Sequence, residues 1–157
     1  MKILITGIHG FVGGNLLKAL GQSNEIYGLD IVAPEKEGVV KTFSWDDLDE
    51  NKIPQVDAVI HLAGKAHDLK KTFGPEVYFK VNTGLTQKMY DWFLKSSAGK
   101  FIFFSSVKAA ADFVPGDILT EDVVPNPVGP YGESKIKAEE YILSHPAADK
   151  QVYILRP

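Results

Sequence analysis

Short apolar runs alternate along this chain with segments of helical period, and this alternation constrains the fold more than any other feature. Most of the runs are continuously apolar, which is typical of strands buried on both faces in a parallel sheet covered by helices. We therefore predict an α/β fold, a doubly wound parallel sheet of about six strands flanked by helices. The expected strands are 2–6, 25–30, 39–43, 57–62, 100–104 and 151–155, and the expected helices are 11–20, 75–94 and 130–143.

Two segments do not follow the alternation. Residues 44–56 are polar and are expected to form a loop or a short helix. Residues 107–129 are a long connection with three prolines, and loops of that length inside a compact domain are usually functional. At 157 residues the chain is expected to form one domain. It stops directly behind the last expected strand, so we expect residues 1–157 to be cut from a longer protein.

Composition and charge exclude several classes of function. The formal net charge of −3 gives no electrostatic footprint for nucleic acid or for an anionic membrane. No run of 18 apolar residues predicts a membrane span, and the short N-terminal apolar run does not resemble a secretion signal. There is no cysteine, and the four histidines show no metal-ligand spacing. A cytoplasmic protein that binds no metal, nucleic acid or membrane is expected.

The stretch ITGIHGFVGG places three glycines, Gly7, Gly10 and Gly13, between the first strand and the first helix. The next expected strand ends at Asp30, about twenty residues beyond Gly10. This context is typical of a dinucleotide-binding (Rossmann) loop, in which glycines let the backbone approach a pyrophosphate and the acid binds ribose hydroxyls. The alternative is a tight turn that binds nothing. Because Asp30 would repel a 2′-phosphate, NAD is favoured over NADP. Gly14 lies outside the three-residue spacing of the other glycines and is assigned to helix packing.

A tyrosine and a lysine, Tyr131 and Lys135, lie four residues apart at the start of the last expected helix. Residues with this spacing share a helix face, so a phenol and an ammonium can address one site. A nearby cation favours a phenolate, which is what acid–base catalysis on an alcohol needs. Taken alone, the pair is more commonly a surface pair.

Two serines, Ser105 and Ser106, follow the fifth expected strand. In open α/β sheets ligands bind at the carboxyl ends of the strands, so these hydroxyls are placed where a substrate would lie. Taken alone, an ordinary strand-to-loop serine pair is the simpler interpretation. Together with the glycine loop, Asp30, Tyr131 and Lys135, however, coincidence becomes improbable.

In this order the motifs TGIHGFVG, HLAG, FFSS and YGESKIKAE resemble the extended short-chain dehydrogenase/reductase family over the whole chain. Within the family, the chain is similar to the branch of NAD-dependent nucleotide-sugar epimerases and dehydratases that resemble UDP-glucose 4-epimerase. The similarity is to the N-terminal portion of these proteins. The resemblance implies that Ser106 polarises the substrate, Tyr131 transfers its proton, and Lys135 binds the nicotinamide ribose. Ser106 is preferred to Ser105 because it lies 25 residues before Tyr131, the separation expected in that branch.

The resemblance also implies which residues contact NAD. Besides Tyr131 and Lys135, they lie at five places along the chain. They are Gly7, Gly10, Phe11, Val12 and Gly13 in the glycine loop and first helix turn, Asp30 at the end of the second strand, Asp47 and Leu48 near the adenine, Leu62, Ala63 and Gly64 after the fourth strand, and Asn82 on the long helix. For Asn82 a solvated helix residue is an equal alternative. For His61 a buried, hydrogen-bonded histidine is the preferred interpretation.

Two positions depart from the family pattern. Val107 and Lys108 follow the serine where dehydratases carry an acidic pair, so an epimerase or a simple oxidoreductase is favoured over a dehydratase. The usual Gly-Thr pair after the helix asparagine is replaced by Thr83-Gly84. The first of these departures leaves the sugar undetermined.

The expected function is therefore that of an NAD-dependent nucleotide-sugar epimerase that acts through a 4-keto intermediate. The alternatives are a dehydratase or reductase of the same family, or a non-catalytic NAD-binding or sensing module. Because the family's C-terminal substrate region is absent, these 157 residues are expected to bind NAD with little turnover. A homodimer through the helices that begin near Pro75 and Pro130 is also implied by the resemblance.

Overall fold

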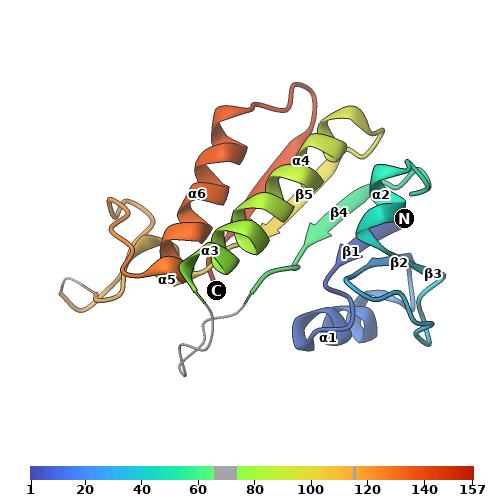
Figure 1. Cartoon of the computed structure of the whole chain (residues 1–157), viewed down its shortest axis with the longest axis horizontal. Helices are drawn as coiled ribbons and strands as arrows, with labels where there is room; N and C mark the ends of the chain where they lie inside the picture. The colour runs from blue at the N-terminus through green and yellow to red at the C-terminus, as the bar shows by residue number, and fades with distance from the viewer. Residues whose placement is uncertain (66–73, 115) are drawn as a thin grey trace. The chain divides into compact units, whose positions relative to one another are not determined.

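A computed structural model of the chain describes residues 1–65, 74–114 and 116–157 (Figure 1). The chain divides into two compact units. The first comprises residues 1–63, 91–103 and 147–153, and the second comprises residues 64–90, 104–146 and 154–157. No helix in the described part of the chain is long and apolar enough to cross a membrane.

The first unit contains a six-stranded sheet in the order β3-β2-β1-β4-β5-β6. The strands are β1 Lys2–Thr6, β2 Glu25–Leu29, β3 Lys41–Phe43, β4 Ala58–His61, β5 Lys100–Phe104 and β6 Gln151–Leu155, of which the last two run on into the second unit. The pairs β1–β2, β1–β4, β2–β3 and β4–β5 are parallel. The predicted doubly wound sheet is confirmed, with strand bounds that differ from prediction by up to two residues, a normal uncertainty at element ends.

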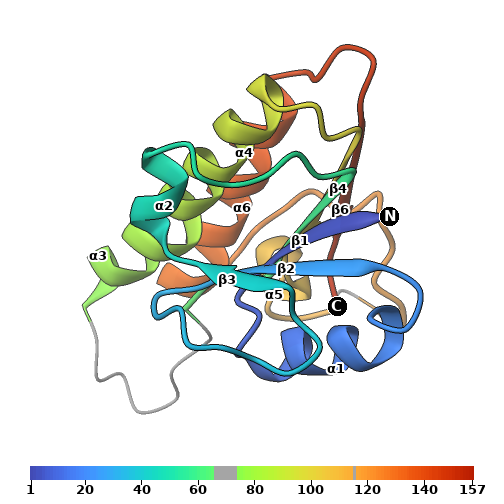
Figure 2. The same ribbon diagram turned by 90° about the vertical axis from the view of Figure 1, so that its right-hand side faces the viewer.

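Two helices of the first unit lie on opposite sides of this sheet, as Figure 2 shows. They are α1, Phe11–Leu20, and the short α2, Trp45–Asp49, which forms in the polar segment where a loop or short helix was expected. The core beside α2 is aromatic: His61 stacks on Phe103 with ring centroids 5.7 Å apart, and Phe93 packs on Phe101 at 5.1 Å. The central strands β1 and β4 are therefore buried on both faces, as their apolar sequences require, whereas the edge strand β6 is partly exposed.

The second unit is helical, and helix α6 (Pro130–Ser144) packs against its other helices. These are α3 Pro75–Tyr78, the π-helical turn η1 Phe79–Gly84, the first part of α4 Leu85–Lys95, and the short α5 Val107–Ala110. Residues 75–94 were expected to form one regular helix, whereas the structure inserts a π turn at Asn82. The predicted loop 107–129 begins with α5, and Ala111 bridges to Asn126 farther along it.

Candidate active site

The glycine loop has the backbone that its sequence predicts. Gly7 has a φ of +70°, and its N–H donates to the carbonyl of Leu29 at 2.8 Å. A Cβ on Gly7 would come within 3.1 Å of the Ala63 nitrogen. A Cβ on Gly13 would lie 2.5 Å from the Gly7 carbonyl oxygen. Gly7 and Gly13 are thus required by the fold of the loop itself, because any side chain there would displace backbone.

Helix α1 begins with unsatisfied backbone donors. Its N-cap residue, Gly10, has no side chain to accept a hydrogen bond, and the first turn contains no acidic residue. The first N–H groups of a helix point outward and carry partial positive charge, which makes such an end suitable for an anionic group. Phe11, the first residue of this turn, is 89% exposed, and Val12 is also exposed. An uncapped helix start after a glycine loop is a suitable cradle for a pyrophosphate.

Asp30 holds the same loop. Its carboxylate accepts hydrogen bonds from the N–H of His9 at 3.0 Å and from the N–H of Ile31 at 2.8 Å. Asp30 is only half-buried, so the carboxylate retains capacity for further donors such as ribose hydroxyls. The glycine loop and Asp30 are therefore brought together at the carboxyl end of the sheet, where ligands of such folds bind.

The end of β4 is fixed by Thr6. The Thr6 hydroxyl oxygen accepts the N–H groups of Leu62 at 3.1 Å and Ala63 at 3.0 Å, and it lies 2.7 Å from Nδ1 of His61. Because the hydroxyl already accepts two N–H groups, this arrangement favours donation of its own proton to Nδ1 of His61. The prediction of a buried, hydrogen-bonded His61 is confirmed. Since both N–H groups are engaged with Thr6, Leu62 and Ala63 would contact a cofactor through other atoms.

Asp47 and Leu48 have structural roles in α2. Asp47 forms a capping box with Ser44, in which each residue's side chain accepts the other's backbone N–H. The Asp47 carboxylate accepts hydrogen bonds from the Ser44 N–H and from the Ser44 hydroxyl, and these two, the backbone one first, lower the pKa of Asp47. Leu48 is buried, with 4% of its surface exposed. Contact of this pair with adenine remains a prediction.

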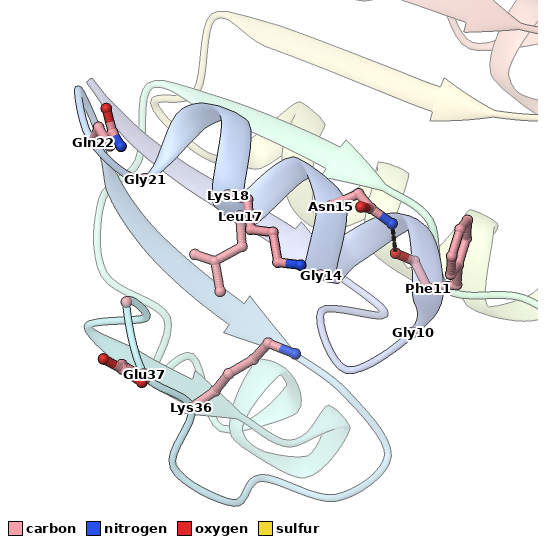
Figure 3. A pocket seen from close by; sticks show the side chains of 11 residues that line it. Gly10, Phe11, Gly14, Asn15, Leu17, Lys18, Gly21, Gln22, Lys36 and Glu37 are labelled. Atoms are coloured by element: carbon pink, nitrogen blue, oxygen red, sulfur yellow. Dashed lines mark hydrogen bonds between the residues drawn. The ribbon is translucent and has the colours of Figure 1, made fainter.

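A groove of about 900 Å³ runs along the outer side of α1 (Figure 3). Gly10, Phe11 and Gly14 lie at one end, and Lys36 and Glu37 lie across from the helix. Gly14 was expected to serve helix packing, and this is wrong. A Cβ there would meet only the Lys36 ammonium, at 3.9 Å. Gly13 is the glycine that packs. Asp30 does not line this groove. The groove therefore adjoins the glycine loop at Gly10 and is not the ribose site proposed at Asp30.

In the second unit, Asn82 is fully buried and not solvated, so the solvated alternative is excluded. Its Oδ1 accepts the N–H of Lys65 at 2.7 Å, and its Nδ2 donates to the Lys65 carbonyl at 3.2 Å and to the Ser134 hydroxyl at 2.9 Å. Ser134 in turn donates to the Tyr131 carbonyl at 2.8 Å. The π turn thus directs Asn82 toward the helix turn that carries Tyr131.

Gly64 lies beside this network. A Cβ on Gly64 would come within 2.9 Å of the Asn82 Oδ1 and 3.4 Å of the Lys135 ammonium. The structure therefore brings Gly64, Asn82 and Lys135 together, and their contact with NAD remains a prediction. Lys135 is 5% exposed, and its ammonium donates to the Phe104 carbonyl at 2.8 Å. Burial lowers the pKa of Lys135 to about 8, partly opposed by the negative charge of Glu139.

Ser105 and Ser106 have different environments. Ser105 donates its hydroxyl proton to the buried carboxylate of Glu139. Ser106 is the N-cap of α5, and its oxygen accepts the N–H of Lys108 at 3.3 Å, while its own hydroxyl proton has no acceptor among the residues that the structure describes. The preference for Ser106 as the catalytic serine is consistent with this division of roles.

Tyr131 is half-buried in the first turn of α6, and its ring meets that of Tyr78 edge to face at 6.4 Å. The next residue, Gly132, is in close contact with α5: a Cβ there would lie 2.3 Å from the Lys108 carbonyl oxygen. α5 and the first turn of α6 are therefore pressed together. Lys108 itself forms an ion pair with Asp112.

Sequence reasoning assigned no role to Thr6, Ser134, Glu139 or Arg156. Glu139 is 1% exposed and binds Ser105 and Arg156. One signal could have found it. Glu139 lies four residues after Lys135 on the helix face that also carries Ala138 and Ile142, and a carboxylate on a buried face needs partners. Thr6 and Ser134 gave no comparable signal.

The strand order is that of a Rossmann-type α/β protein, and the second unit carries the predicted residues Ser106, Tyr131 and Lys135. Residues 3–157 match the NAD dependent epimerase/dehydratase family, and the chain belongs to that family.

Three similar proteins illustrate the family. The chain is 30% identical to UDP-glucose 4-epimerase of Vibrio cholerae, covering 99% of this chain and 51% of the relative. It is 27% identical to GDP-6-deoxy-D-mannose reductase of Pseudomonas aeruginosa, covering 90% and 46%. The structure of UDP-glucuronic acid 4-epimerase from Bacillus cereus with UDP-glucuronic acid and NAD matches with a TM-score of 0.81 and 25% identity, covering 99% and 56%. The chain therefore spans about half the length of the relatives it matches.

Proposed function

We propose that the protein containing this chain is an NAD-dependent epimerase of nucleotide-linked sugars. The observation that carries the proposal is the arrangement in the second unit. Tyr131 and Lys135 share one face of α6, and Ser106 caps the short helix pressed against its first turn. UDP-sugars bound to solved relatives, and epimerases among the curated relatives, support the same conclusion.

The described residues fit NAD. The uncapped start of α1 and the glycine loop would take the pyrophosphate, and Asp30 would accept hydrogen bonds from the adenosine ribose. In the second unit, Gly64, Asn82 and Lys135 are the residues that we propose for binding the nicotinamide ribose. When bound, NAD supplies an acceptor and donor of hydride for a sugar carbon.

The chain's own residues would move protons at one sugar hydroxyl. Tyr131 would take the hydroxyl proton and later return it, acting as the general base and then the general acid. Ser106, whose oxygen already accepts the Lys108 N–H, would donate its free proton to the same sugar oxygen. The Lys135 ammonium, one helix turn from Tyr131, would stabilise the phenolate by its charge.

The residues after Ser106 favour epimerisation over dehydration. Val107 and Lys108 stand where a dehydratase needs an acid and a base, and the Lys108 ammonium is paired with Asp112. Elimination of water requires a group that removes a carbon-bound proton, which neither a valine nor an ion-paired lysine supplies. A reductase differs from an epimerase in net redox change, not in this residue set.

The test is a product analysis with the complete gene product. The protein is incubated with NAD and with UDP-glucose, UDP-galactose or UDP-glucuronic acid, and the sugars are separated by ion-exchange chromatography. We expect interconversion of one pair of C4 epimers without net formation of NADH. Stoichiometric formation of NADH together with a keto-sugar would identify a net oxidoreductase, and loss of water would identify a dehydratase. Either result would overturn the epimerase assignment.

Homodimerisation through α3–α4 and α6, and a cytoplasmic location, are further proposals from the family resemblance.

A further inference from the structure

A buried ionic cluster lies beside the Ser-Tyr-Lys set in the second unit. Glu139 accepts a hydrogen bond from the Ser105 hydroxyl, and the Arg156 guanidinium binds both its oxygens, with Nε at 3.1 and 3.2 Å. Glu139 is 1% exposed and Ser105 5% exposed. A carboxylate without water is stable only with partners of this kind, so the three side chains form one unit, which we call the Glu139 cluster.

The cluster and Lys135 hold the same end of β5. Lys135 donates to the carbonyl of Phe104, and Glu139, one helix turn later, accepts from the hydroxyl of Ser105. The backbone N–H of Ser105 also donates to the Leu155 carbonyl at 2.7 Å, next to Arg156. Two consecutive residues are thus fixed to α6 by two consecutive turns. The next residue in the chain is Ser106.

The charge of Glu139 acts on Lys135. Burial lowers the pKa of the Lys135 ammonium, Glu139 raises it in opposition, and Arg156 is ion-paired with Glu139. Other ionisable groups lie on the elements packed against α6, directly after α5, or on the first turn of α6 itself: Glu76, Tyr78, Lys80, Lys108, Asp112, Tyr131 and Glu133. Glu139 is the charged neighbour that raises the pKa of Lys135.

We propose that Glu139, held by Arg156 and Ser105, is a positioning residue that keeps the Lys135 ammonium charged and fixes the strand end before Ser106. The catalytic meaning of this role rests on the proposed function, whereas the electrostatic role does not. Glu139 touches neither substrate nor cofactor in this account. It acts through Lys135 and through the backbone of residues 104–106.

The test uses two substitutions with opposite expected effects. In Glu139→Gln the negative charge is lost while Arg156 remains, so the pKa of Lys135 should fall below its starting value of about 8. In Arg156→Gln the carboxylate is no longer offset, so the same pKa should rise. Glu140→Gln removes an equal charge from an exposed position of α6 and should leave the pKa unchanged. Loss of packing alone would not move the pKa in opposite directions.

The measurement is an NMR titration of the protein labelled with ¹³C-lysine, with the Lys135 signal assigned from Lys135→Arg. It requires neither substrate nor turnover. If Glu139→Gln does not fold, the double variant Glu139→Gln/Arg156→Gln carries the test, because it leaves no unpaired buried ion. Its Lys135 pKa should lie below the wild-type value but above that expected for Glu139→Gln alone. Unchanged values, or shifts of one sign in both single variants, would overturn the inference.

A second arm connects the inference to activity. In the complete gene product, the alkaline limb of kcat/KM should move down in Glu139→Gln and up in Arg156→Gln. If the Lys135 signal shifts as expected and no nucleotide sugar is turned over, the proposed function fails and the positioning role stands. If activity is present and the Lys135 signal does not move, the positioning role fails alone.

Discussion

At the scale of single residues, the site depends on charged side chains that are buried and whose desolvation cost is offset by specific partners. Lys135 is the clearest case, because its ammonium is buried on a carbonyl oxygen beside a carboxylate that Arg156 already binds. Burial holds its pKa at about 8 in the folded protein, against an ordinary value of 10.5. The folded protein therefore favours the neutral amine more than the unfolded chain does.

This shift predicts a pH-dependent stability. Between pH 8 and 10.5 the unfolded state binds more protons at Lys135, so the free energy of unfolding rises with pH across this window. Comparison of Tyr131→Phe with Tyr131→Phe/Lys135→Met isolates the effect, because the phenol that we propose Lys135 to act on is then absent from both proteins. The single variant should gain up to about 3 kcal/mol relative to the double variant between pH 7 and pH 10.5 in urea unfolding. Parallel curves for the two proteins would contradict the burial of a titrating amine.

At the scale of elements, the loop before α1 shows how adjacent glycines can have different roles. Gly13 lies against the Gly7 carbonyl and the backbone of Ile8, where a Cβ would come within 2.5 to 2.9 Å. Gly14 borders the open groove beside Lys36. Sequence spacing identified the loop but could not separate these two environments, because the separation depends on how the loop folds back on the helix.

A matched pair of substitutions tests this difference. Gly13→Ala should destabilise the protein by about 1–3 kcal/mol, because the methyl group forces the loop away from the helix. It should also weaken NAD binding. Gly14→Ala should be neutral or stabilise by up to about 1 kcal/mol, because alanine is the better helix former and has space. Urea unfolding measures both, and equal losses in the two variants would show that the loop is not packed as described.

The order of the elements could be predicted from the sequence, whereas the π turn and the side-chain networks could not. The order of strands and helices followed from apolar runs and glycine signals, so the sheet was predictable. The π turn at Asn82 was not, because nothing in the local sequence distinguishes six residues of wider helix from a regular one. The Glu139 cluster depends on Arg156 and Ser105, which lie 17 and 34 residues away from Glu139, and such pairings arise only from the tertiary fold.

At the scale of the whole molecule, a ligand that binds the folded state stabilises all of it. NAD at 100 times its dissociation constant should raise the free energy of unfolding by about 2.7 kcal/mol. NADP at the same concentration should stabilise less, because Asp30 would face its 2′-phosphate. Asp30→Asn should narrow the difference between the stabilisation by NAD and that by NADP. Asp46→Asn, which removes a charge from an exposed position of α2, should leave that difference unchanged. Equal thermal shifts with NAD and NADP in the wild type would contradict the proposed role of Asp30.

The central claim is that Tyr131 exchanges a proton with a sugar hydroxyl, and one substitution tests it most directly. In the complete gene product, Tyr131→Phe removes the phenolic oxygen and little else, so kcat for epimerisation should fall by about 10²–10⁴-fold. The control is Tyr141→Phe, on the same helix, where the ring packs on His145 at 4.1 Å. Its kcat should remain close to that of the wild type. Turnover by Tyr131→Phe at the wild-type rate, with nucleotide sugar and NAD both saturating, would contradict the account.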